Sequence, residues 1–316
     1  MRAYLLQRLA AMALTLLGVS LLIFTMIRLV PGTVVEQLLG QAAIASPEVL
    51  AAFRRFFGLD RPVHLQYIEW LASVLRGDFG VSWLSGRPVL AMFLERVPVS
   101  AELAALAVGW SLLIGVPLGT ASAVWHGGVR DGAIRVIATL GLSLPAFWQG
   151  TVLILLFSIH LGWMPSLQWV PFTHRPATNL LTMALPALTL GTATAAMITR
   201  MSRSTMLDVL GREYVRTARA KGLPERRVTF HHALRNALIP VVTVAGVQLG
   251  YIVGGIVVVE DVFTLPGVGR LLLYAIFQRD YPVVQGVILL LAAAFMVLNL
   301  AVDLLYAVLD PRLRRG

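Results

Sequence analysis

The stretch EYVRTARAKGLPERRVTFHHALRNALIP, from Glu213 to Pro240, decides the fold of this chain. It is strongly basic and rich in helix-forming residues, and it lies between two apolar segments that are long enough to cross a membrane. Most of it cannot lie in lipid, because charged side chains are costly in the bilayer core. We therefore expect it to lie on the cytoplasmic surface, where a soluble partner can reach it.

The composition is that of an integral membrane protein. Of the 316 residues, 58% are hydrophobic and only 13% are charged, whereas a soluble globular domain has about 25% charged residues. The chain has no cysteine, which excludes disulfides, thiolate metal sites and cysteine nucleophiles. The net charge of +10 is concentrated beside the apolar runs, as orientation signals are, so we do not expect nucleic acid as a partner.

Six apolar runs reach the length of about 20 residues that a spanning helix needs. They cover approximately residues 9–27, 101–125, 134–161, 180–198, 238–259 and 283–309. The sequence therefore predicts an all-α integral membrane protein with six transmembrane helices. Pro117, Pro145 and Pro186 interrupt or flank these runs, and we expect them to kink the helices.

The distribution of basic residues predicts the orientation of the spans. The segments assigned to the cytoplasm carry Arg2, Arg8, Arg130, Arg135, Arg200, Arg203, Arg212, Arg216, Arg219, Lys221, Arg226, Arg227, Arg235, Arg312, Arg314 and Arg315. The short opposite loops carry only Arg175, Arg270 and Arg279. Both termini are therefore predicted to be cytoplasmic. Arg28 follows the first span where a small-residue cleavage site would stand, so we interpret this span as an uncleaved anchor.

The first outside loop, about residues 31–98, is long and contains two predicted helices. Ser46 can cap the first of them, which would end at Gly58. The second, over residues 62–77, places Tyr67, Ile68, Leu71 and Leu75 on one apolar face. We interpret the loop either as a lid on the membrane domain or as a surface that receives a delivered substrate, and the two are compatible. This divides the chain into residues 1–98 and residues 99–316.

No catalytic motif is present in the sequence. A phosphate-binding loop needs glycines followed by Lys-Ser or Lys-Thr, but Lys221 is the only lysine and Gly222 and Leu223 follow it. We therefore expect no ATP hydrolysis by this chain itself. His231 and His232 are adjacent and do not share a helix face, so we predict no metal site there. An intramembrane hydrolase has no support, since neither H-E-x-x-H nor G-x-S-x-G occurs.

The basic segment has the features of a short helix on the membrane surface. Glu213 to Lys221 are good helix formers, Gly222 suits a left-handed C-cap, and Pro224 enforces a turn before the next helix leads into the fifth span. Such a helix can convert the motion of a partner into tilting of the spans. The simpler interpretation is an ordinary basic loop that only sets the orientation.

Polar and small residues inside the spans give weaker signals. Gly246, Gly250 and Gly254 recur every four residues in the fifth span, which predicts close packing of helices or, alternatively, the lining of a narrow pathway. Asp303 lies near the cytoplasmic end of the last span, where an ionisable group is a candidate functional residue. It can equally reach the interface or pair with a nearby arginine.

The basic segment resembles the coupling segment in permeases of ATP-binding-cassette importers. The signature of that segment is Glu-Ala-Ala, three residues, Gly, nine residues and Ile-x-Leu-Pro. Ala218, Gly222 and Leu234 match it, while Arg216, Thr217, His232 and Arg235 depart from it. The departures follow the variant typical of the dipeptide, oligopeptide and nickel permease family, which reads YxRTARAKG and then HALRNALIP.

Further motifs of this family follow in the right order along nearly the whole chain. They are RLVPG at 28–32, FGLDRP at 57–62, GDFGVS at 77–82, VVVEDVFTLPGVGRLL at 257–272, RDYPVVQG at 279–286 and LDPRLR at 309–314. One departure is that Thr33 and Val34 replace the usual Asp-Pro. The chain is similar to the first-type permease of the family, which has the extended outside loop.

The resemblance implies a type I importer fold with a coupling helix at about residues 208–223. It implies a heterodimer with a second, paralogous permease, two ATP-binding subunits below the bilayer, and an extracytoplasmic solute-binding protein. ATP and Mg²⁺ would be bound by the partner subunits, and this chain would hold no cofactor or metal. The residues that carry over to ATPase coupling are Glu213, Tyr214, Arg216, Thr217, Ala218, Gly222 and Leu234.

The resemblance leaves the cargo open. Dipeptides or oligopeptides are the leading expectation, nickel or a nickel chelate is the next, and some members carry glutathione or sugars. The expected location is the cytoplasmic membrane of a bacterium or archaeon. A different class, an ATP-independent channel or carrier, would need its own ion site or gating charges, and the spans carry few carboxylates.

Overall fold

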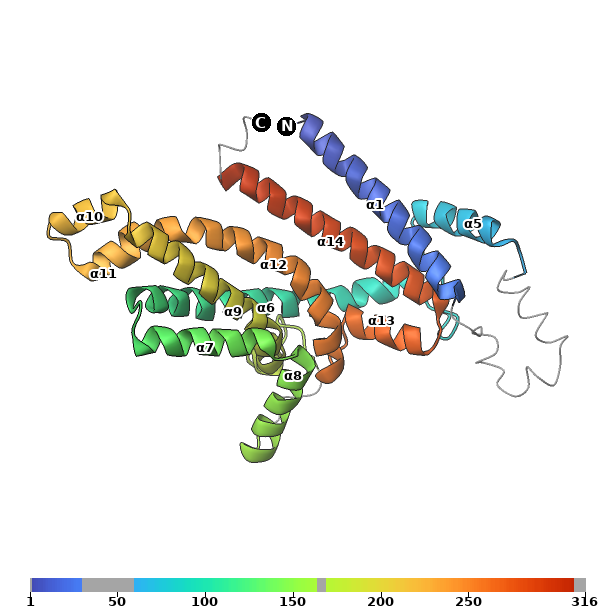
Figure 1. The fold of residues 1–316 in the computed structure, drawn as a ribbon. Helices are drawn as coiled ribbons and strands as arrows, with labels where there is room; N and C mark the ends of the chain where they lie inside the picture. The colour runs from blue at the N-terminus through green and yellow to red at the C-terminus, as the bar shows by residue number, and fades with distance from the viewer. Residues whose placement is uncertain (1, 30–59, 164–168, 310–316) are drawn as a thin grey trace. The chain divides into compact units, whose positions relative to one another are not determined.

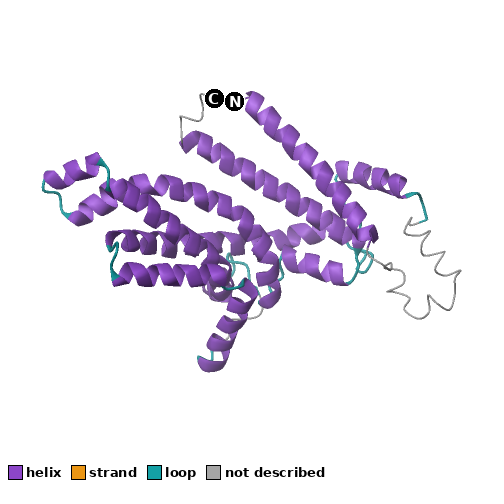
Figure 2. Ribbon diagram, in the orientation of Figure 1, coloured by secondary structure: helices purple, strands orange, loops and turns teal. Residues whose placement is uncertain are grey.

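The computed structural model describes residues 2–29, 60–163 and 169–309, and within these ranges all regular elements are helical (Figure 2). Val81 and Pro88 form an isolated antiparallel bridge. The helices, labelled in Figure 1, are α1 (Arg2–Leu29), α5 (Val63–Leu75), α6 (Val89–Val124), α7 (Val129–Ser143), α8 (Ala146–Leu155), η1 (Leu156–His160), α9 (Pro176–Leu210), α10 (Glu213–Ala220), α11 (Glu225–Arg227), η2 (Val228–Ala233), α12 (Leu234–Val262), α13 (Val268–Phe277) and α14 (Tyr281–Leu309).

Among the described residues, four helices are long and apolar enough to cross a membrane, and two bent helix pairs bring the number to as many as six. The four are α1, α6, α9 and α14, at the positions of the first, second, fourth and sixth predicted spans. α6 has 36 residues and α9 has 35, so each is about 50 Å long at 1.5 Å per residue. Both therefore exceed the bilayer core, which is about 30 Å thick.

The third predicted span is two helices rather than one. α7 and α8 are bent by 105° relative to each other, and Pro145 lies at the break as the residue before α8. Leu144 has an extended conformation, with φ −83° and ψ 127°, because the ring of a following proline disfavours helical geometry. The expectation that Pro145 distorts the run over residues 134–161 is confirmed, and the bent pair together is one candidate span.

The fifth predicted span is bent as well. The helix that contains it changes direction by 49° between Gln248 and Gly250, and glycine is a common site of helix kinks. The π-helical turn η2 precedes α12. The helix is thus irregular at two points, just before the span and near its middle.

The chain divides into two compact units. One contains residues 1–98 and 270–316, and the other contains residues 99–269. In the first unit α1 packs along α14, and α5 contacts α1. Residues 30–59, with the predicted helix from Ser46 to Gly58, lie outside the described residues, as do residues 310–316 and the side chain of Asp303.

The loop before α6 is tied to the start of α14 within the first unit. The Ser82 hydroxyl donates a 2.5 Å hydrogen bond to one oxygen of Asp280, and the Trp83 backbone N–H donates to the other at 3.1 Å. Asp280 is buried, so these donors offset the cost of removing its charge from water. Two of the family motifs, GDFGVS and RDYPVVQG, therefore meet in space.

The second outside helix forms as predicted, but a different face of it packs. Tyr67 and Trp70 of α5 contact Phe24 of α1, with ring centroids 5.1 and 5.9 Å apart. The Tyr67 hydroxyl also lies 2.9 Å from that of Ser20. Ile68 and Leu75 are exposed, so the predicted apolar face was partly wrong. The aromatic pair with Phe24 determines the rotation of the helix, because aromatic rings bury the largest apolar area.

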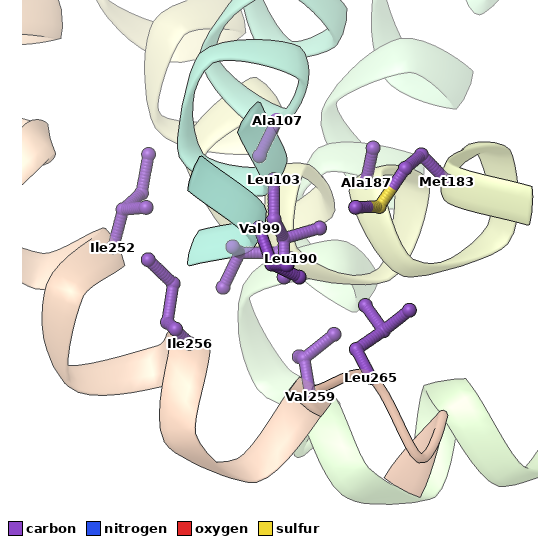
Figure 3. Close-up of a cluster of buried hydrophobic side chains, with 10 residues drawn as sticks. All are labelled: Val99, Leu103, Ala107, Met183, Ala187, Leu190, Ile252, Ile256, Val259 and Leu265. Atoms are coloured by element: carbon purple, nitrogen blue, oxygen red, sulfur yellow. The ribbon is translucent and has the colours of Figure 1, made fainter. Parts of the chain in front are cut away.

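In the second unit α9 is the central helix, with α7, α8 and α12 packed on it. Figure 3 shows the apolar cluster between α6, α9 and α12, to which Leu103, Met183 and Ile256 belong. Glycines allow the helices to approach closely: a Cβ atom at Gly119 would lie 2.5 Å from both Ser202 Cβ and Thr199 O, and one at Gly191 would lie 2.7 Å from Ala107 O. Gly115 and Gly119 form the small-residue pair of membrane helix interfaces.

We predict that Gly119→Ala destabilises the protein by about 1–3 kcal/mol, because the added methyl meets backbone that must shift. The matched control is Gly109→Ala in the same helix, where nothing lies within 4 Å of the new Cβ. Thermal unfolding of the purified complex measures both. Equal unfolding temperatures for the two variants would show that α6 and α9 do not pack this closely.

Candidate functional site

The basic segment folds into a compact structure between α9 and α12. α10 is an eight-residue helix, and α11 and η2 lead from it back into α12. α10 is amphipathic: Val215 and Ala218 are buried, with exposed fractions of 0% and 6%. They pack in a cluster with Met206 and Val209 of α9 and with Ala233 of η2, among others. We call this cluster, with Ala123, Val228 and Ala237, the α10 core.

The C-terminal end of α10 has a Schellman cap. Gly222 has a φ of +79°, which glycine adopts without the Cβ penalty of other residues. The Leu223 N–H donates to Ala218 O at 3.4 Å, and the Gly222 N–H donates to Arg219 O at 2.9 Å. Leu223 also packs on the α10 core, which is the apolar contact that accompanies this cap. The predicted C-cap at Gly222 is thus present.

Tyr214 links α10 to the beginning of α12. Its hydroxyl accepts a 2.9 Å hydrogen bond from Asn236 Nδ2 and lies 3.5 Å from the His232 carbonyl oxygen. The same Asn236 amide donates to His232 O at 3.1 Å. The Tyr214 side chain of the surface helix, the His232 backbone carbonyl of the π-turn and the Asn236 side chain of α12 therefore form one hydrogen-bonded group. Asn236 was not among the residues predicted from the sequence, because nothing in a single asparagine indicates this contact.

The outer face of α10 is polar and exposed. Glu213, Arg216, Thr217 and Lys221 are all exposed. Arg216 pairs with Glu213 at 3.0 Å along the helix, and such an exposed pair contributes little to stability. This face is therefore open to a partner, at no cost to the packing of the chain itself.

The predicted coupling residues separate into two sets. Glu213, Tyr214, Arg216, Thr217 and Gly222 are exposed. Ala218 is buried in the α10 core and Leu234 packs against it. The Ala and Leu that match the signature thus pack in or against the α10 core, and they hold α10 in place.

None of the three glycines of the α12 stripe is fully buried. Gly246 and Gly250 are half-buried, and Gly254 is exposed with nothing within 4 Å of a Cβ placed there. The neighbouring Gly255 makes the close approach, to Leu190 of α9. A role for Gly246, Gly250 and Gly254 in packing or in a pathway remains a prediction.

A buried ion pair joins α7 to α9 at the same end of this unit. Arg203 donates two 2.8 Å hydrogen bonds to the Asp131 carboxylate, which is 3% exposed. Ser122 Oγ and the Gly127 N–H donate to the same carboxylate at 2.6 and 3.1 Å. Arg203 had been assigned only an orientation role from the sequence. Arg203 and Asp131 are 72 residues apart in the sequence, so no local sequence pattern indicates that they pair.

The other side of the segment carries an open groove. Pro224, Arg226, Arg227, Phe230 and His231 line it, and its volume is about 420 Å³. Phe230 is 58% exposed, so a large aromatic side chain of this groove is open to the surroundings. Arg219 of α10 pairs with Glu225 at 2.7 Å and holds the turn before the groove. Within the described residues, no group of three or more His, Asp or Glu side chains forms a metal-binding cluster.

Comparisons with known proteins match this chain over nearly its whole length. Residues 115–315 match the family described as binding-protein-dependent transport system inner membrane component. Residues 1–104 match the N-terminal part of the membrane component of binding-protein-dependent transport systems. The α10 segment lies within the first match.

Curated relatives extend the likeness to individual proteins. The glutathione transport system permease protein GsiC of Salmonella choleraesuis (strain SC-B67) is 42% identical over 311 residues, which is 98% of each chain. The protein of the same name from Pectobacterium atrosepticum is 41% identical and that from Escherichia coli (strain K12) is 40% identical, both over 98% of each chain. This chain therefore belongs to the family of inner membrane components of binding-protein-dependent transport systems, as a type I permease subunit of an ATP-binding-cassette importer in the peptide and nickel group.

Proposed function

We propose that this chain forms half of the translocation pathway of an importer for glutathione or peptides of similar size. The observation that carries the proposal is the 40–42% identity, over 98% of both chains, to proteins named glutathione transport system permease. Glutathione is a tripeptide, so this cargo falls within the chemistry expected from the family. Longer peptides, nickel and sugars are the other cargoes that the family allows.

The partners follow from the importer class. The proposed complex contains a second, paralogous permease, a solute-binding protein on the outside, and two separate subunits that bind ATP and Mg²⁺. Both termini of this chain and α10 face the cytoplasm in this arrangement, in accordance with the basic residues that flank the spans. The support is the membership of the family together with the exposed, polar outer face of α10.

We further propose that α10 acts as the coupling helix. Its exposed face contacts an ATP-binding subunit, and its buried face transmits the movement to α9 and α12 through the α10 core. The bond between Tyr214 and Asn236 adds a polar link to α12. ATP binding would close the two ATPases, swing the spans to an outward-open state, and hydrolysis would reset them.

The cargo can be tested by uptake of labelled glutathione, dipeptide, longer peptide and nickel into cells with and without this chain, with the other subunits intact. We expect deletion to abolish glutathione uptake and expression of the chain to restore it. Loss of nickel or long-peptide uptake alone would reassign the cargo and leave the coupling proposal standing. Unchanged uptake of all four would remove the cargo proposal.

The docking face can be tested with Thr217→Trp. Thr217 is exposed, so the variant should fold and insert into the membrane. The indole should block the surface on which the ATP-binding subunit docks. We expect at least a several-fold loss of co-purified ATP-binding subunit and a matching loss of uptake. Thr173→Trp, in an exposed turn outside the α10 segment, is the control. Full ATPase recovery with Thr217→Trp would contradict docking at this face.

The transmission step is tested separately with Tyr214→Phe. This variant keeps the ring and removes the hydroxyl that bonds Asn236, so it should retain the ATPase but import less solute per ATP hydrolysed. Loss of one neutral hydrogen bond is worth about 1 kcal/mol, which predicts a decrease of a few-fold. Tyr251→Phe on an exposed position of α12 serves as the control. An unchanged ratio of uptake to hydrolysis would exclude this bond from coupling.

A further inference from the structure

A cavity of about 360 Å³ lies within the first unit, at the C-terminal end of α1. Its walls come from α1, α5, the loop before α6 and the first turns of α14. The lining is rich in aromatic side chains and includes one arginine, and it consists of Phe24, Arg28, Gln66, Glu69, Trp70, Ser73, Asp78, Phe79, Gly80, Val81, Trp83, Tyr281, Pro282 and Gln285.

Arg28 is half-buried in this wall, and its partners are neutral. Its Nε and Nη2 donate to the Gln66 side-chain oxygen at 3.2 and 2.8 Å, and its Nη1 donates to the Phe24 backbone oxygen at 3.0 Å. The guanidinium also lies 3.3 Å from the centre of the Phe24 ring. A guanidinium has five N–H donors, so two of them have no acceptor among the described residues. A partly buried charge without an opposite charge is costly.

A second donor in the same wall is also unsatisfied. The indole Nε1 of Trp70 is buried and has no hydrogen-bond acceptor within the described part of the chain. The two carboxylates of the lining are exposed and already engaged. Glu69 pairs with Arg61, and Asp78 accepts a 2.8 Å hydrogen bond from the Gly80 N–H. The cavity therefore has an excess of donors around one uncompensated positive charge, which favours an anionic ligand.

The surroundings of the cavity favour the anionic headgroup of a lipid. Leu21, Leu22 and Met26 of α1 and Ile68 of α5 are between 53% and 60% exposed, so the surface beside the cavity is apolar. α1 is a candidate span, and Trp and Tyr gather where spans leave the hydrocarbon. Trp70, Trp83 and Tyr281 supply these aromatic groups at the end of α1. The phosphate groups that are abundant at the end of a membrane span are those of lipid headgroups.

We propose that this cavity binds the headgroup of a membrane phospholipid, with the phosphate on Arg28. The two free N–H groups of the guanidinium donate to phosphate oxygens, and the aromatic side chains cover the glycerol end. The bound lipid supplies the negative charge that the described residues do not provide. It also joins α1, α5 and α14 at their common end. The proposal does not depend on which cargo the importer carries.

The test uses the intact importer complex in detergent and native mass spectrometry. The complex is incubated with dioleoyl-phosphatidylglycerol or with dioleoylglycerol, which has the same chains and no phosphate. We expect wild type to retain the phospholipid and not the diacylglycerol, and Arg28→Gln to lower the affinity for phospholipid by about tenfold or more, since hydrogen bonds to charged groups are strong. Equal retention of the two lipids by wild type would overturn the proposal.

Three further arms localise the site and identify the source of the phosphate. Arg76→Gln removes an exposed charge of the same unit that lies outside the cavity lining, and it should retain the lipid. Ser73→Phe fills the cavity and leaves Arg28 intact, so it should release the lipid even if Arg28→Gln fails to assemble. Inorganic phosphate and glutathione are added at millimolar concentration as competitors. Displacement of the lipid by either would assign the cavity to a soluble anion, and retention by Ser73→Phe would place the lipid elsewhere.

Discussion

The proposed function depends on one packing interaction. Val215 and Ala218, on the buried face of α10, pack against the ends of α9 and α12. An eight-residue helix is too short to be stable alone in water, so its conformation comes from this contact. Both residues are almost completely buried, and a larger side chain at Ala218 would separate the helix from its seat. A partner that pushes on α10 therefore pushes on a packed core.

The buried ion pair extends this rigid body to the corner between α6 and α7. Asp131 receives four hydrogen bonds, from Arg203, Ser122 and the Gly127 backbone. Breaking such a pair by removing one partner leaves an uncompensated buried charge, which costs several kcal/mol. Ala123, next to Ser122, belongs to the α10 core. An ion pair, hydrogen bonds and apolar packing thus connect α10 with the ends of α6, α7 and α9.

Sequence patterns correctly predicted the features that depend only on neighbouring residues. The C-cap at Gly222, the short helix before it and the break at Pro145 depend on residues within a few positions of each other, and all three are present. The rotation of α5 was missed, because it depends on Phe24, more than forty residues away in α1. The pairs Asp131 with Arg203 and Ser82 with Asp280 were also missed for this reason. In the coupling signature, the family pattern identified Ala218, but only the structure shows that it is buried.

The geometry of α12 separates a part that packs against α10 and α9 from a part that is bonded elsewhere. The π-turn η2 lies before this helix and the 49° bend lies within it, between Gln248 and Gly250. Between these points Ala237 belongs to the α10 core, and Val241 and Ala245 pack with Ile198 of α9. Beyond the bend, Glu260 accepts a hydrogen bond from Ser100, and Ser100 accepts one from the Val268 N–H. A helix without the bend would rotate as one rod and strain these buried bonds, whereas a bend at glycine allows the two halves to change their angle at low cost.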